Sequence, residues 1–411
     1  MVGQRLFLLP DLPRPLARSG SSAIQTKKLE ETKMKKHNII RKFFAVTAAC
    51  AMALSLTACS NGGNTDKSGT TSTAGSAPGT ETVANKDKPL VWFNRQPSNS
   101  STGEENTPAG VKSYKVAIIK QMDHASLDEI AAAVEARLDE IGAENGVTIE
   151  YTTTSGQGDQ TILMQLADQA IADGVDAIIP IATTAAQVAA VSAEETKTPV
   201  VYAAISYPET ADLTGIDYVT GTSDALDTQL ILDMMLAQDP NVESVGLLYS
   251  LSEPNSEVPI AEAKAYLDEK GIAYTEQTAN TNDEVVAAAS ALIAAGVDAI
   301  FTPTDNIIMA AELAIYEDLA AAGIPHYTGA DSFVRNGAFA ACGVNYTNLG
   351  AETANLAYQA ITQGMDSMEE VYQMPGDTIT VNTETAEALG ADYSMFEGMA
   401  ENLVTVTTTL D

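Results

Sequence analysis

The sequence predicts an α/β protein made of two similar doubly wound parallel-sheet lobes, joined by a hinge and separated by an interlobe cleft. Two observations lead to this prediction. Short apolar strands alternate with amphipathic helices in each half, an order typical of parallel sheets with helices on both faces. The second observation is a repeat, because Gly174–Ile178 returns residue for residue as Gly296–Ile300, each time after an Ala-rich helix.

The first half alternates strictly between strand and helix. Ile130, Val134, Leu138 and Ile141 recur at helical spacing and therefore predict an amphipathic helix. In chain order, the expected elements are a strand at 115–119, a helix at 127–141, a strand at 147–152, a helix at 160–172 and a strand at 176–181.

The second half repeats this order. Pro180 and Pro303 are expected to end the matching strands of the two halves. The expected elements are strands at 245–249, 273–277 and 298–303, with helices at 258–270 and 283–295 between them. Further along the chain we expect strands at 327–329, 338–344 and 378–381 and a helix at 349–361.

Ligands of open α/β sheets bind beyond the carboxyl ends of the strands, so both halves should direct their strand-end loops into one cleft. We expect lobe one to comprise residues 113–222 and 337–365. Lobe two is expected to comprise residues 223–336 and 366–411. Three crossovers between the lobes would form the hinge.

The N-terminal 58 residues are expected to be a signal region, with Met34 as the true start. Basic residues precede an apolar run at 43–56 that is too short to span a membrane comfortably. The run ends at Leu56-Thr57-Ala58-Cys59, which resembles a bacterial lipobox, so lipidation of Cys59 is expected. The alternative is a plain secretory signal. Residues 59–112 are expected to be a disordered tether, since Ser60–Ala84 is rich in Gly, Ser, Thr and Asn.

Charge and composition exclude several classes of function. The whole chain has a net charge of −33, and from Cys59 onward 12 basic residues face 52 acidic ones. Such an acidic surface repels nucleic acid. The chain has three Cys and three His, and it lacks a phosphate loop, a dinucleotide fingerprint and a nucleophile elbow. We expect no metal, no cofactor and no enzymatic activity.

The loops that follow the strands supply the candidate ligand-binding residues. They combine hydroxyl, amide and carboxylate groups with two aromatic side chains. The candidates are Gln121, His124, Thr183, Thr184, Ser206, Tyr207, Glu253, Asn255, Ser256, Asp305, Asn306, Asp331, Ser332 and Phe333.

In their order and spacing these loops resemble the substrate-binding proteins of ABC importers, specifically the tryptophan/tyrosine-type family, from about Tyr114 to about Gly390. The resemblance implies a type I periplasmic-binding-protein fold, capture of a small solute (often an aromatic amino acid) and delivery to a membrane permease. Two departures concern the ligand. Ser206-Tyr207-Pro208 stands where the family usually has Thr-Asp-Pro, and Phe333 stands where a small residue is common.

The residues also suggest individual roles. Thr183 and Thr184 open a helix, whose N-terminal N–H groups suit a carboxylate. Asp305 or Asp331 could receive an ammonium group. For each of these residues helix capping or turn formation is the alternative role. Glu253, Asn255 and Ser256 could likewise bind or cap, and Tyr207 and Phe333 could form apolar walls or simply pack.

We therefore expect a monomeric, lipid-anchored extracytoplasmic solute-binding component of an ABC importer, held at the cell membrane through Cys59, with an amino acid, including an aromatic one, as ligand. One alternative is a sugar-binding lipoprotein, because 88–104 resembles a fragment of galactose/glucose-binding proteins. A ligand-sensing lipoprotein and an enzyme on the same fold are the others. Cys342 is expected to be a buried core thiol and His326 a structural residue.

Overall fold

The computed structural model describes residues 111–409, which lie within one compact unit of the chain, Ser101–Asp411. The predicted signal region, the lipobox with Cys59, most of the tether and the fragment at 88–104 lie outside the described residues. Over 111–409, no helix is both long and apolar enough to cross a membrane.

The first sheet has six parallel strands in the order β11-β5-β4-β3-β1-β2. Its strands are β1 (Ser113–Lys120), β2 (Thr148–Ser155), β3 (Ala177–Ile181), β4 (Val200–Tyr202), β5 (Val219–Ser223) and β11 (Tyr372–Gln373). Four helices accompany it: α2 (Ala125–Asn145), α3 (Gln160–Ala172), α4 (Thr183–Ser192) and α11 (Tyr346–Gln363).

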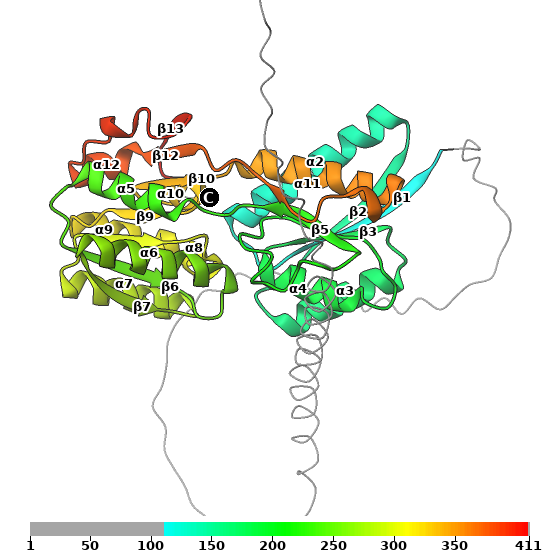
Figure 1. The fold of residues 1–411 in the computed structure, drawn as a ribbon, viewed down its shortest axis with the longest axis horizontal. Helices are drawn as coiled ribbons and strands as arrows, with labels where there is room; N and C mark the ends of the chain where they lie inside the picture. The colour runs from blue at the N-terminus through cyan, green and yellow to red at the C-terminus, as the bar shows by residue number, and fades with distance from the viewer. Residues whose placement is uncertain (1–110, 410–411) are drawn as a thin grey trace, which may run out of the picture. The chain divides into compact units, whose positions relative to one another are not determined.

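Alternate residues of β1 explain why helices cover both faces of this sheet. Val116 and Ile118 pack in the cluster that contains the apolar residues of α2 and α11. Ala117 and Ile119 belong to a different cluster, formed with α3 and α4. Successive strand residues point to opposite faces, so an unbroken apolar strand is buried on both sides. Figure 1 shows α2 and α11 on one side of the sheet and α3 and α4 on the other.

The second sheet has seven strands in the order β13-β12-β10-β9-β8-β6-β7, and only the β10–β12 pair is antiparallel. Its strands are β6 (Ser244–Tyr249), β7 (Ala273–Thr278), β8 (Ala299–Thr302), β9 (His326–Thr328), β10 (Ala340–Gly343), β12 (Thr378–Asn382) and β13 (Asn402–Val406). Its helices are α5 (Thr228–Gln238), α6 (Glu257–Lys270), α7 (Asn282–Ala295), α8 (Asn306–Ala311), α9 (Tyr316–Ala321), α10 (Asp331–Arg335) and α12 (Thr383–Leu389).

Four short 3-10 turns complete the fold: η1 (Pro254–Ser256), η2 (Glu312–Ala314), η3 (Met365–Ser367) and η4 (Ser394–Phe396). The predicted strands and helices of both halves are present, with α3 at its predicted bounds. One detail was wrong. Pro180 lies within β3 instead of ending it, and its carbonyl accepts a hydrogen bond from the N–H of Ala203.

Sheet membership places two segments differently from the predicted lobe bounds. We assigned 337–365 to lobe one, but β10 pairs with β9 and β12 of the second sheet. We assigned 366–411 to lobe two, but β11 pairs with β5 of the first sheet. The chain therefore crosses between the sheets after β5, after β10 and between β11 and β12. The predicted bounds differ because the apolar pattern shows where a strand ends but not to which sheet that strand belongs. It therefore does not show where the chain crosses from one sheet to the other.

Candidate functional site

A cavity lies beyond the carboxyl ends of strands from both sheets. Its volume is about 20 Å³, which is room for roughly one water molecule. From the first lobe it is lined by His124, Ser126, Leu127, Ala182, Thr183, Ala204, Ser206, Asp224 and Tyr346. From the second lobe it is lined by Asn255, Thr304, Asp305, Asn306, Met309, Ala330 and Phe333.

The backbone turns sharply where β3 and β4 reach the cavity. Ala182 has φ 76° and ψ 162°, and Ala204 has φ 57°. Residues with a Cβ seldom adopt positive φ, and such strain often occurs at functional sites. Ala182 is the N-cap, so Thr183 and Thr184 are the first two residues of α4 and neither has the alternative role of N-cap. The N–H of Thr184 donates to Oε1 of Gln121 at 3.0 Å.

A buried hydrogen-bond network joins the two lobes beside the cavity. Nε2 of Gln121 donates to Oε1 of Glu253 at 2.7 Å, and Nδ2 of Asn306 donates to Oε2 of Glu253 at 2.6 Å. Nε2 of His124 lies 3.0 Å from Oδ1 of Asn306, an oxygen that can only accept. His124 therefore carries its proton on Nε2. Its Nδ1 is buried and has no hydrogen-bond partner among residues 111–409.

Burial changes the protonation of this network. Desolvation lowers the pKa of His124 to about 4, so the imidazole is neutral at pH 7. Desolvation, with a repulsive contribution from Asp305, raises the pKa of Glu253 to about 8. A neutral His124 leaves Nδ1 as an acceptor, directed at no protein donor in the described part of the chain.

Asp305 is committed to protein donors. As the N-cap of α8, its Oδ1 accepts from the N–H groups of Ile307 and Ile308, both at 3.1 Å. Its Oδ2 accepts from the N–H of Ser250 and from Oγ of Ser256, both at 2.7 Å. A carboxylate has about four acceptor positions, so little capacity is left for a ligand. The capping alternative is the one that the geometry favours.

Asp224 is a functional candidate that the sequence interpretation missed. It follows β5 directly, is 3% exposed, and lines the cavity. Its Oδ1 accepts from Oγ of Ser206 at 2.8 Å and its Oδ2 accepts from the hydroxyl of Tyr346 at 3.1 Å. Burial raises the pKa of its carboxyl group. Its position directly after a strand could have identified Asp224 as a candidate. The strand at 219–223 was not among those we expected, so this position was not recognised.

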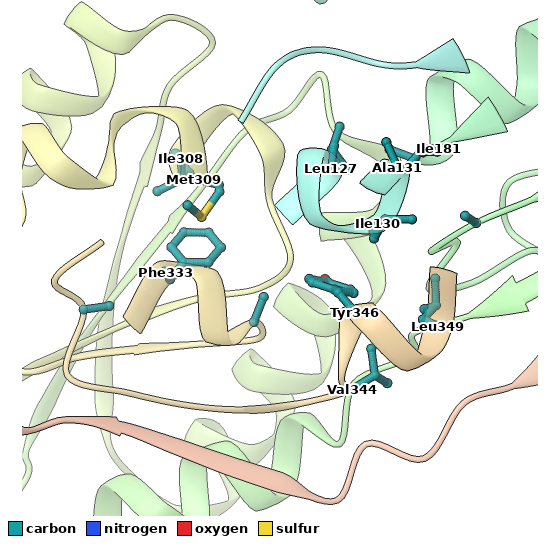
Figure 2. Packing of buried hydrophobic residues seen from close by; sticks show 14 of the residues in the cluster. Leu127, Ile130, Ala131, Ile181, Ile308, Met309, Phe333, Val344, Tyr346 and Leu349 are labelled. Carbon is teal, nitrogen blue, oxygen red and sulfur yellow. The ribbon is translucent and has the colours of Figure 1, made fainter. Parts of the chain in front are cut away.

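Apolar side chains from both lobes face the cavity. Leu127 and Tyr346 come from α2 and α11, whereas Met309 and Phe333 come from α8 and α10. Figure 2 shows Phe333 close to Met309, with Leu127 and Tyr346 on the neighbouring α2 and α11 segments. All four belong to one buried cluster, which continues from one lobe into the other. Together they offer two apolar walls.

The predicted residues fall into three groups. Seven line the cavity: His124, Thr183, Ser206, Asn255, Asp305, Asn306 and Phe333. Five others are hydrogen-bonded to lining residues or to one another directly behind them: Gln121, Thr184, Glu253, Ser256 and Ser332. Tyr207 and Asp331 do not line it. Asp331 instead pairs with Arg335 at 2.5 Å.

Besides Asp224, the sequence interpretation missed eight lining residues: Ser126, Leu127, Ala182, Ala204, Thr304, Met309, Ala330 and Tyr346. All of them except Met309 and Tyr346 lie within the strand-end loops that supplied the candidates. Over residues 111–409, no group of three or more His, Cys, Asp or Glu residues is arranged to hold a metal ion.

The chain is similar to known proteins over most of the described residues. The family model described as "ABC transporter substrate binding protein" matches residues 115–395. A "Tyrosine-binding protein" of Clostridioides difficile strain R20291 is 26% identical over 300 residues, which cover 72% of this chain and 86% of that protein.

Two solved structures are also similar. One is the structure of an ABC domain from Streptococcus pneumonia in complex with L-Trp, with 28% identity and a TM-score of 0.63, covering 71% of this chain and 100% of that one. The other is a conserved domain protein from Vibrio cholerae, with 28% identity, a TM-score of 0.65 and the same two coverages. Together with the two helix-covered sheets, these similarities confirm the predicted fold class, a two-lobed type I periplasmic-binding-protein fold.

Proposed function

This chain belongs to the ABC transporter substrate-binding protein family, and from that premise we propose that it captures an α-amino acid with an aromatic side chain between its lobes. The solute would then be delivered to the permease of an ABC importer. One observation carries the proposal: the cavity is built from polar and apolar groups of both lobes, at the strand ends where ligands of α/β sheets bind. The named specificities of a tyrosine-binding and a tryptophan-bound relative support the choice of solute.

The apolar walls favour an aromatic side chain. Leu127 and Tyr346 on one lobe and Met309 and Phe333 on the other line the same cavity. A planar ring between such walls buries apolar surface on both faces, and ring or sulfur contacts with it add further attraction. Of the two predicted wall residues, Phe333 lines the cavity and Tyr207 does not.

Capture requires that the lobes separate and close. A cavity of about 20 Å³ is far smaller than an amino acid, so the lobes must lie further apart than in this structure both when the solute enters and while it is held. In this structure the lobes are joined directly by the hydrogen bonds of Gln121 with Glu253 and of His124 with Asn306. A solute that contacts both lobes stabilises the closed state by its differential affinity. No covalent step and no cofactor is part of this function.

We further propose that the protein acts outside the cytoplasm as a monomer anchored to the cell membrane. The lipobox at 56–59 supports lipidation of Cys59, and the Gly/Ser-rich stretch after it supports a flexible connection to the globular part. Such an anchor would hold the lobes near the permease.

A calorimetric titration of the purified protein with L-tryptophan, L-tyrosine, aliphatic amino acids, sugars and nucleosides tests the solute class. We expect L-tryptophan or L-tyrosine to bind more tightly than every other compound. Binding of galactose or glucose without a response to any amino acid would contradict the proposal and favour a sugar-binding protein. Conversion of any added compound to a product would favour an enzyme.

A further inference from the structure

We propose that Asp224 is the residue that selects a cationic amine on the solute, and that it acts from the hinge between the lobes. The inference rests on the proposed function, because it assigns the group in that same site that recognises the solute. It starts from the charges around the cavity. Three buried carboxyl groups lie in or beside it, those of Asp224, Glu253 and Asp305. Among the described residues that line the cavity, none is Lys or Arg.

The three carboxylates differ in how well the protein satisfies them. Asp305 accepts four hydrogen bonds, two of them from the first turn of a helix, where the helix dipole also favours negative charge. Glu253 accepts two bonds from amide groups. Asp224 accepts side-chain hydrogen bonds from two neutral hydroxyls, so Asp224 and Glu253 both have less compensation for a buried negative charge than Asp305 has. Asp224 also lines the cavity, which Glu253 does not.

Two further acceptors in the cavity lack donors. Nδ1 of His124 and Oδ1 of Asn255 are buried, and neither has a hydrogen-bond partner among residues 111–409. The amide orientation of Asn255 is fixed because its Nδ2 donates to the carbonyl oxygen of Thr304 at 2.6 Å. The lining therefore has an excess of acceptors and one incompletely compensated carboxylate. A protonated amine brings three donors and a positive charge, which is the complement of this lining.

The position of Asp224 connects solute binding to the hinge. Asp224 stands at the first crossover, immediately after β5, and its partner Tyr346 opens α11 immediately after the second crossover. Its other partner, Ser206, lies 3.2 Å from Oγ1 of Thr304 on the second lobe. A cation at Asp224 would therefore strengthen a chain of contacts that includes two crossovers and a lobe-to-lobe hydrogen bond. This gives the amine a greater affinity for the closed state.

The test removes the amine from the solute and the charge from Asp224, separately and together, and measures the binding affinity each time. L-Tryptophan, indole-3-propionate, which lacks the amine, and tryptamine, which lacks the carboxylate, are titrated into wild type and Asp224→Asn. The same is done for L-tyrosine and its two analogues. Asp217→Asn is the matched control, because that carboxylate is in the same lobe, close in sequence and 80% exposed. Thermal unfolding checks that each variant folds.

We expect wild type to prefer the amino acid to its des-amino analogue by at least about ten-fold, the size of one charge-assisted hydrogen bond. Asp224→Asn should lower the affinity for the amino acid by a similar factor and the affinity for the des-amino analogue by less than about three-fold. Asp217→Asn should change neither affinity. Equal binding of the two compounds by wild type, or equal loss of both in Asp224→Asn, would overturn the inference. If Asp224→Asn does not fold, the crystal structure of wild type with L-tryptophan decides, and an amine placed away from Asp224 would overturn the inference.

The outcomes separate this inference from the proposed function. Binding of tryptamine or tyramine but of no amino acid, with loss in Asp224→Asn, would contradict amino-acid capture and support the role of Asp224. Binding of amino acids with no dependence on the amine would support capture and contradict the role of Asp224. Binding of neutral sugars alone would contradict both.

Discussion

At the scale of single residues, residue type was easier to predict than the partner of each side chain. Asp305 was correctly placed at a strand end facing the site, yet two of its four donors, Ser250 and Ser256, come 55 and 49 positions before it in the chain. No local pattern contains that information. Asp224 was missed for a related reason: β5 ends in Thr222-Ser223 and Asp224 follows it, a polar sequence that resembles a loop until the neighbouring strand is known.

The role of Asp305 as a cap can be tested by its stability effect. Asp305→Asn should lower the free energy of unfolding by about 2–3 kcal/mol, because an amide cannot accept from Ser250 and Ser256 while it also accepts from α8. Ser256→Ala, which removes one of the donors, should cost less, about 1 kcal/mol. Urea denaturation measures both. If Asp305→Asn were as stable as wild type, the capping role would be refuted.

The strained backbone at Ala182 leads to a prediction of opposite sign. Its φ and ψ lie in a region that is nearly restricted to glycine. Ala182→Gly should therefore raise the free energy of unfolding by about 1 kcal/mol. Ala185→Gly, three residues further along in the first turn of α4, is the control and should destabilise by about 1 kcal/mol. If Ala182→Gly and Ala185→Gly both lowered the free energy of unfolding, the proposed backbone strain at Ala182 would be contradicted.

At the scale of secondary structure elements, periodicity predicted the alternating strands and helices well, because central strands such as β3 and β8 are buried on both faces and helices such as α2 on one. It predicted the sheet of β12 but not the sheets of β10 and β11. These two strands are only four and two residues long. Their sheets depend on distant partners, since Ala340 pairs with Val381 and Tyr372 pairs with Thr222. The antiparallel β10–β12 pair has no signal in the local pattern either.

The contact between α2 and α10 makes a prediction about closure. Arg335 on α10 pairs with Glu129 on α2, an ion pair that joins the two lobes outside the cavity. Arg335→Gln should weaken solute binding by about two- to five-fold, the effect of one partly exposed pair on the closed state. Arg137→Gln is the matched control, because Arg137 pairs with Glu140 and Glu144 within the same helix. Calorimetry measures both affinities, and equal effects would argue against a role in closure.

At the scale of the whole molecule, a lobe-to-lobe carboxyl group should make stability depend on pH. The pKa of Glu253 is raised to about 8 from its ordinary 4.5. Between these values the folded protein retains a proton that the unfolded chain releases, so the contribution of Glu253 to stability is greatest below pH 4.5 and falls as the pH rises towards 8. Glu253→Gln should make this slope shallower between pH 5 and 8.

Urea denaturation at several pH values provides the measurement for Glu253. Glu257→Gln is the control, because this nearby carboxyl group is exposed at the start of α6. A slope that is unchanged in Glu253→Gln, or changed equally in both variants, would refute the assignment. The acidic surface as a whole contributes to solubility, whereas this single buried group would contribute to the slope.

The central claim is that a small solute is held between the lobes and contacts both of them. The most direct test is the crystal structure of the protein with the amino acid that binds most tightly. We expect the aromatic ring between Leu127 and Tyr346 on one side and Met309 and Phe333 on the other, with the amine at Asp224. A solute bound to one lobe only, or outside the residues that line this cavity, would contradict the claim.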